Sequence, residues 1–124
     1  MLYLDTHAII YLYSGTLDLF SNFGRTLIQS ETLLISPIIL LELEYLYEIG
    51  KINVPSSKIY SGLKKDCGLN TCRIDFIDVI ECAKGLTWTR DPFDRLIVAQ
   101  ALVNQSMLLT KDRNISDHYD FAKW

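Results

Sequence analysis

The sequence predicts one α/β domain, residues 1–124, with three α/β/α layers built on a central parallel sheet. Two observations support this prediction. Short apolar runs alternate with longer segments that carry helix boundary residues. The runs near Leu2, Leu33 and Leu108 are apolar at successive positions, which is typical of strands covered on both faces. With 124 residues, 49% of them hydrophobic, the chain is long enough for a core without disulfides.

Strands are predicted where a run of apolar or β-branched residues is too short for a helix. In chain order these segments are Leu2–Asp5, Thr32–Ser36, Thr71–Ile77 and Ser106–Thr110. The tail from Asp117 to Trp124 either adds a last short strand or packs on the surface.

Helices are expected between these strands, with caps, prolines and glycines marking their ends. The first runs from Thr6, a possible N-cap, to Gly15, and the second lies within Leu17–Ser30. The third runs from Pro37, behind the cap Ser36, to Gly50, and the fourth begins at Ser56 or Ser57 after the turn at Pro55. The last two cover Asp78–Leu86 and Pro92 to about Asn104.

Composition excludes several classes of protein. A formal net charge of -3 argues against a general cationic coat for nucleic acid, although it permits local basic rims. The cysteines Cys67, Cys72 and Cys82 form no C-x-x-C pair, and no histidine stands at ligand spacing from them, so we expect free thiols and no zinc. No apolar run approaches the roughly 18 residues of a membrane span. We therefore expect a soluble, cytoplasmic protein.

Acidic residues follow the predicted strands and open one of the helices. In open parallel sheets, functional sites lie outside the carboxyl ends of the strands. Asp5 stands at such an end, Asp112 follows another by two residues, and Asp91 and Asp94 begin the helix at Pro92. Three segments are therefore expected to bring carboxylates to one rim.

Glu42 is the fourth acid, chosen by its position on a predicted helix. Its neighbours three and four residues away are apolar or aromatic, whereas those of Glu44 include charges. A carboxylate on an apolar face is costly unless it is paired or binds a cation. We expect Glu42 to face the interior and Glu44 and Glu48 to be solvated.

The candidate site consists of Asp5, Glu42, Asp94 and Asp112, with Asp91 as a further possible ligand. Clustered carboxylates repel one another, and an all-oxygen set suits Mg²⁺ or Mn²⁺. Such a cation activates water and stabilises charge on a phosphodiester.

Purely structural alternatives stay open for single residues. Asp91 before Pro92 is a suitable N-cap, Asp5 could cap the helix near Thr6, and Asp112 could belong to a turn. Capping accounts for Asp91 better than for Asp94, whose helix neighbours are apolar.

Four blocks of the chain resemble PIN-domain ribonucleases, specifically VapC-type toxins of bacterial type II toxin–antitoxin pairs. They are "LYLDTHAIIYLY", "ISPIILLELEYLYEIGKINVP", "RDPFDRLIVAQAL" and "LLTKD". By resemblance they supply Asp5, Glu42, Asp94 and Asp112 as metal ligands, with Asp91 as a helper. One departure is Leu41, where the subgroup with the DPFDR block often has tryptophan.

The resemblance implies Mg²⁺-dependent endonucleolytic cleavage of RNA, control by a cognate antitoxin, and a homodimer. Candidate substrate-binding residues are Thr6, Arg90, Arg95, Thr110 and Lys111. The alternative is a catalytically silent PIN-like module that binds RNA or protein. Phosphoryl-transfer domains of the dehalogenase type need Asp-x-Asp after the first strand, whereas this chain has Asp-Thr-His.

Overall fold

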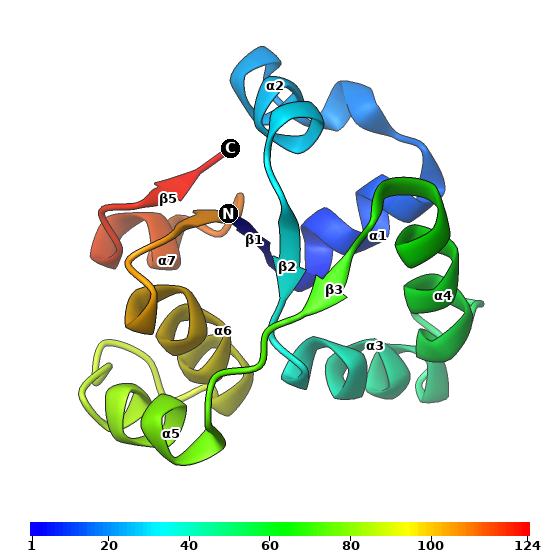
Figure 1. Cartoon of the computed structure of the whole chain (residues 1–124). Helices are drawn as coiled ribbons and strands as arrows, with labels where there is room; N and C mark the ends of the chain where they lie inside the picture. The colour runs from blue at the N-terminus through cyan, green and yellow to red at the C-terminus, as the bar shows by residue number, and fades with distance from the viewer.

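The computed structural model describes residues 1–124 and has the predicted three-layer architecture. Its strands are β1 (Leu2–Leu4), β2 (Leu33–Ile35), β3 (Asn70–Thr71), β4 (Met107–Leu109) and β5 (Ala122–Lys123). They form one sheet in the order β3-β2-β1-β4-β5, and every neighbouring pair is parallel. The prediction of a central parallel sheet flanked by helices is confirmed (Figure 1).

The helices bring distant acids into neighbouring elements. They are α1 (Thr6–Ser14), the 3-10 turn η1 (Leu17–Leu19), α2 (Asn22–Ser30), α3 (Ile38–Glu48), α4 (Ser56–Cys67), α5 (Phe76–Lys84), α6 (Pro92–Val103) and α7 (Arg113–His118). In Figure 1, α3 and α4 lie together at the right, and α5 and α6 lie together at the lower left. Because α3 also contacts α6, the helices that carry Glu42 and Asp94 are neighbours.

The core is centred on β1, the middle strand of the sheet. Leu2, Tyr3 and Leu4 are all buried, so side chains on both faces of this strand pack against other elements. This burial explains why the strand is apolar at every position. Complete burial of one such side chain contributes about 1.5–3 kcal/mol.

Most helix ends lie where the local signals indicated. Gly15 ends α1 with a φ of 73°, a left-handed conformation that glycine adopts without strain. Helix α3 begins at Ile38 rather than Pro37, a difference within the usual variation in assigned ends. Of the two N-caps that the sequence allowed for α1, Thr6 and Asp5, the structure has Asp5.

The predicted strand Thr71–Ile77 is also wrong in most of its length. Strand β3 contains only Asn70 and Thr71, whereas Phe76 and Ile77 form the first turn of α5. Phe76 and Ile77 are exposed, so their hydrophobicity did not signal a buried strand. The buried residues of α5, Val79 and Ala83, have the four-residue spacing of a helix.

The tail forms the suggested last strand, β5, but it is preceded by an unpredicted helix. Helix α7 has only six residues, too few to show a clear periodicity in sequence. Asp112 caps this helix, with its carboxylate accepting a hydrogen bond from the Ile115 backbone N–H at 3.0 Å. The turn expected at Asp112 is therefore a helix N-terminus.

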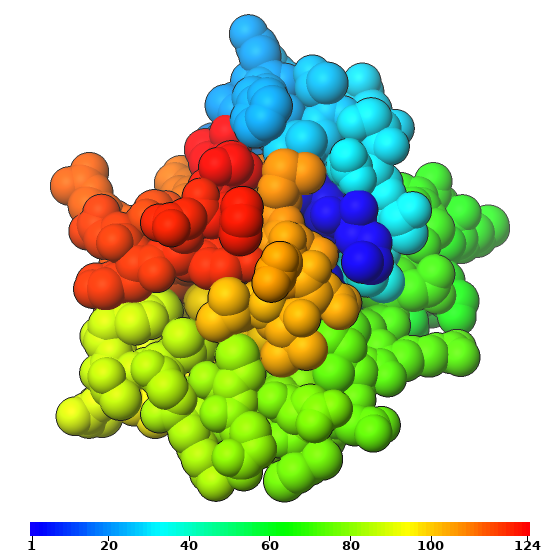
Figure 2. Space-filling model, turned by 60° about the vertical axis from the view of Figure 1, so that its left-hand side comes forward, coloured from blue at the N-terminus to red at the C-terminus, as the bar shows by residue number.

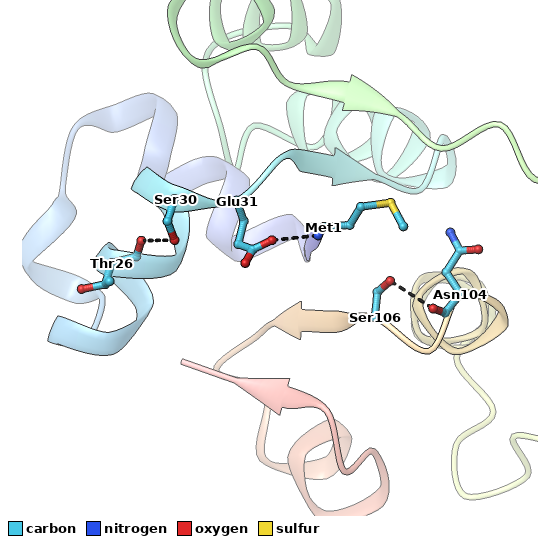
Figure 3. Close-up of polar contacts among 6 residues, drawn as sticks. All are labelled: Met1, Thr26, Ser30, Glu31, Asn104 and Ser106. Carbon is cyan, nitrogen blue, oxygen red and sulfur yellow. Dashed lines mark hydrogen bonds and ion pairs between the residues drawn. The ribbon is translucent and has the colours of Figure 1, made fainter.

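Polar contacts join segments at the amino-terminal edge of the sheet. The Met1 amino group pairs with Glu31 at 2.8 Å, and the Ser106 hydroxyl donates to the Asn104 carbonyl oxygen at 3.3 Å (Figure 3). In Figure 2 the dark-blue N-terminal segment is surrounded by orange, cyan and green segments that are distant in sequence. The acids occupy the opposite edge, at the strand carboxyl ends.

Two further expectations can be compared with the structure. Cys67, Cys72 and Cys82 are free thiols, as expected. None of the helices has the length and apolar character that crossing a membrane requires.

Candidate active site

The central pair of strands positions the first two acids. Leu4 of β1 pairs with Leu109 of β4, and the Asp5 backbone N–H donates to the Leu109 carbonyl oxygen at 3.1 Å. Asp5 therefore leaves the sheet beside Thr110. Asp112 follows Thr110 by two residues, so both acids lie at this edge. The parallel register explains how residues from opposite ends of the chain reach one edge.

Asp5 is buried and has a partner for each carboxylate oxygen. Oδ1 accepts a hydrogen bond from the Ala8 backbone N–H at 2.8 Å, which caps α1. Oδ2 accepts a hydrogen bond from the Thr110 hydroxyl. Asp5 thus caps α1 and also lies in the acidic site, so the two roles are not alternatives.

Glu42 lies on the face of α3 that points toward α1. It is half-buried, and one oxygen accepts a hydrogen bond from the buried Thr6 hydroxyl. Glu48 is exposed, as expected. Glu44 is only partly exposed, and its Oε1 accepts from both the backbone N–H and the hydroxyl of Ser56 at 3.1 Å. The expectation of a solvated Glu44 therefore holds only in part, because the first turn of α4 packs on Glu44 and leaves a backbone donor to be satisfied.

The aspartates at the start of α6 have different environments. The Asp91 carboxylate accepts from the Phe93 backbone N–H at 2.8 Å and from that of Asp94 at 3.4 Å, as an N-cap. The Asp94 carboxylate has no hydrogen-bond partner and lines a cavity. The structure therefore confirms the capping role of Asp91 and leaves the Asp94 oxygens available.

All four predicted acids line one small cavity of about 60 Å³. Its walls are Asp5, Thr6, His7, Glu42, Asp94, Ile97, Asp112 and Ile115. As they lie, no three His, Cys, Asp or Glu side chains form a group tight enough to hold a metal ion. A cation here would have to draw the carboxylates closer together.

Burial and mutual repulsion raise the pKa values of three of these acids. The pKa of Asp94 rises from 3.8 to about 7, first through burial and then through the charges of Asp91, Asp112, Glu42 and Asp5. Burial is also the largest cause of the raised pKa values of Asp5 and Glu42, and it outweighs the hydroxyl groups that bond to them.

No fixed cation neutralises this cluster. The structure has two salt bridges, Met1 with Glu31 and Lys84 with Glu81, and neither includes an acid of the cavity. Carboxylate oxygens with a shared excess of negative charge are the donors that hard divalent cations prefer. The chemistry of the donor set therefore fits Mg²⁺ or Mn²⁺.

The candidate substrate-binding residues do not act as one group. Thr6 and Thr110 are buried and donate to Glu42 and Asp5, so both position acids. Arg90 and Arg95 donate to the carbonyl oxygens of Thr87 and Thr89, at 3.0 and 2.8 Å, and neither lines the acidic cavity. Of the three basic candidates, Lys111 alone lies beside the acids, where it lines an adjoining cavity.

This adjoining cavity adds residues that the sequence did not assign to the site. It has a volume of about 200 Å³ and is lined by Asp5, His7, Tyr11, Lys111 and Asp112. Tyr11 was missed, although its position four residues after His7 places both on one face of α1.

The fold and the site together define a class of protein: a three-layer α/β/α domain with clustered acids outside the carboxyl ends of its parallel strands. The PIN domain family matches residues 2–121, so the chain belongs to the PIN domain family. No curated protein matches the chain significantly.

Two solved structures share this fold. A chain of VapBC2 from Rickettsia felis, bound to a DNA fragment from their promoter, superposes with a TM-score of 0.71 at 20% identity, covering 99% of this chain and 98% of that one. A chain of a toxin–antitoxin complex from Klebsiella pneumoniae gives a TM-score of 0.69 at 17% identity, with coverages of 100% and 97%.

Proposed function

We propose that the protein is a metal-dependent endoribonuclease, the toxin of a toxin–antitoxin pair, that hydrolyses RNA phosphodiesters. The observation that carries the proposal is the cluster of Asp5, Glu42, Asp94 and Asp112 around one cavity without a neutralising cation. Membership of the PIN domain family supports nuclease chemistry at this position.

These four acids would hold Mg²⁺ or Mn²⁺, which supplies an activated water and neutralises charge on the phosphate. Asp94, with no hydrogen-bond partner, has its oxygens free for an ion. Thr110 and Thr6 orient the carboxylates of Asp5 and Glu42. Asp91 holds the first turn of α6 and is proposed to reach the cation only through water.

The proposed partners are an RNA substrate, a cognate antitoxin and a second copy of the chain, in the cytoplasm. Support comes from the resemblance to VapC-type toxins and from the similar folds of chains in VapBC2 and in a toxin–antitoxin complex. Large apolar side chains are also exposed on α3 and α5, which would suit protein contacts; they include Leu41, Tyr45, Phe76 and Ile77.

The test is an RNase assay on purified protein with Mg²⁺, with Mn²⁺ and with EDTA. We expect cleavage with either metal and none with EDTA. Asp5→Asn keeps the oxygen that caps α1 but removes the charge, so it should lose cleavage and retain the fold. The control is Glu48→Gln, which removes one exposed acid of α3 and should cleave normally.

Full activity of the Asp5→Asn variant would refute the proposed mechanism. RNA or antitoxin binding without cleavage under any metal condition would instead identify a catalytically silent module. Circular dichroism of both variants shows whether a loss of activity reflects loss of the fold.

A further inference from the structure

The ammonium group of Lys111 lies over two adjacent aromatic rings, those of Tyr11 and Trp124, beside the acidic site. Its Nζ is 5.5 Å from the centre of the Tyr11 ring and 5.8 Å from that of the Trp124 ring. Both distances are within the range of cation–π attraction. The ammonium makes no hydrogen bond and no salt bridge, so all of its donors are free for a ligand.

Trp124 is itself held firmly at the end of β5. Its indole Nε1 donates to the Leu19 carbonyl oxygen at 2.9 Å, and its own carbonyl oxygen accepts from the Ser21 hydroxyl. The Trp124 ring lies 4.7 Å from the Phe20 ring and 6.1 Å from the Tyr11 ring, between centroids. The Tyr11 and Trp124 rings therefore pack edge-to-face against each other under the lysine ammonium.

The lysine lines the cavity of about 200 Å³ that adjoins the acidic one. The two cavities share Asp5, His7 and Asp112. The adjoining cavity is much larger than the ~30 Å³ occupied by one water molecule. Its lining combines two acids, Asp5 and Asp112, with the unpaired ammonium of Lys111, which suits a phosphate next to a carboxylate-bound metal ion.

A role for Lys111 as counter-ion of the acids is less consistent with the geometry. The ammonium forms no salt bridge, so no carboxylate oxygen of Asp5 or Asp112 lies within 4.0 Å of it. The aromatic rings keep the lysine at the cavity wall without neutralising its charge. A lysine in such a position binds a phosphate as a point charge.

We propose that Lys111 binds a backbone phosphate of the RNA and that Tyr11 and Trp124 are positioning residues that hold its ammonium. The inference rests on the proposed function, since it assumes that the acidic site acts on RNA. It adds a phosphate subsite and assigns a role to Trp124, which lies 119 positions after Asp5 in the chain.

The first experiment measures binding of a fluorescein-labelled single-stranded RNA by anisotropy, in EDTA, over a range of salt concentrations. Lys111→Met removes the charge and should weaken binding about tenfold, as expected for one charged hydrogen bond. The slope of log K against log salt should become shallower by about 0.7 for one lost phosphate contact. Lys111→Arg should retain most of the affinity.

The matched control is Lys123→Met, which makes the same charge change on β5. The Lys123 ammonium contacts the Asp120 carbonyl oxygen at 3.3 Å and does not line the cavity. Its affinity and salt slope should equal those of the wild type. An equal loss in both variants would show a general effect of net charge and would overturn the inference.

The positioning role of Trp124 is tested by a double-mutant cycle. Trp124→Leu should weaken RNA binding about two- to fivefold in the wild type, in line with cation–π energies, and should have no further effect in Lys111→Met. Trp124→Phe keeps an aromatic face and should restore binding. Equal losses in both backgrounds would show that Trp124 acts only through the fold, which would overturn its positioning role.

The outcomes also separate this inference from the proposed function. Wild-type cleavage with unchanged RNA binding by Lys111→Met would overturn the subsite alone. Tighter Mg²⁺ binding by Lys111→Met with unchanged RNA affinity would make the lysine a counter-ion and would also overturn it. A wild-type protein that neither binds nor cleaves RNA would refute both.

Discussion

Replacing Asp94 with asparagine should stabilise the metal-free protein while abolishing cleavage. The pKa of Asp94 in the folded protein is about 7, against 3.8 for an unperturbed aspartate, chiefly because the carboxyl is buried. The folded state therefore binds this proton more tightly than the unfolded state. The stabilising contribution is complete below about pH 4 and is lost as the pH rises through 7.

The size of the effect follows from the same pKa values. Each pKa unit corresponds to about 1.36 kcal/mol, so the interval from 3.8 to about 7 sets an upper bound near 4 kcal/mol. Because Asp94 is only half-buried, solvent screening reduces this to about 1–2 kcal/mol. For a domain of this size, that corresponds to an increase in Tm of about 5 °C at pH 8.

The measurement is thermal unfolding in EDTA, followed by circular dichroism, from pH 4 to pH 8. The Tm of Asp94→Asn should match that of the wild type at pH 4 and exceed it increasingly up to pH 8. Glu48→Gln removes an exposed acid of α3 and should show no such trend. A Tm difference that is absent at pH 8, or independent of pH, would refute the assigned electrostatic cost of Asp94.

Three further predictions concern the metal and the groups that support the site. Mg²⁺ at a hundred times its Kd should raise the free energy of unfolding of the wild type by about 2.7 kcal/mol, seen as a higher Tm in thermal unfolding. The Tm of Asp94→Asn should be nearly unchanged by the same Mg²⁺ concentration. Thr110→Val should lower the free energy of unfolding in urea by about 1–3 kcal/mol, because Asp5 loses a buried hydrogen-bond donor. Thr110→Ser keeps the hydroxyl and should lower it much less, and equal losses in the two variants would contradict the role of the hydroxyl. Glu44→Ala should lower the free energy of unfolding by about 1 kcal/mol, since the Ser56 N–H at the start of α4 loses its acceptor, and RNA cleavage should be normal. A loss of cleavage would show that Glu44 belongs to the site.

The placement of acids around the cavity was largely predictable from sequence. Glu42 and Asp94 were selected because the residues three and four positions from each on its helix are largely apolar. The structure puts both at the predicted cavity. Glu44 could not be assigned in the same way, because its partner Ser56 comes from α4, whose packing on α3 leaves no local signal.

Errors in the predicted elements have a related cause. The apolar and β-branched residues of Thr71–Ile77 favoured a strand, but Phe76 and Ile77 are exposed on the first turn of α5. Exposed apolar residues give the same local pattern as buried ones, and only packing distinguishes them. Helix α7 has six residues and depends on the cap at Asp112 rather than on a repeating apolar face.

The sequence by itself determined the α/β/α class, the positions of β1, β2, β4 and most of the helices, and the edge at which the acids gather. These features follow from short apolar runs, caps and helix spacing, which are signals carried by residues a few positions apart. Only the tertiary structure decided which hydroxyl serves which acid and which rings hold Lys111. The Thr110–Asp5 bond spans 105 positions, and such contacts depend on how whole elements pack, which local periodicity does not encode.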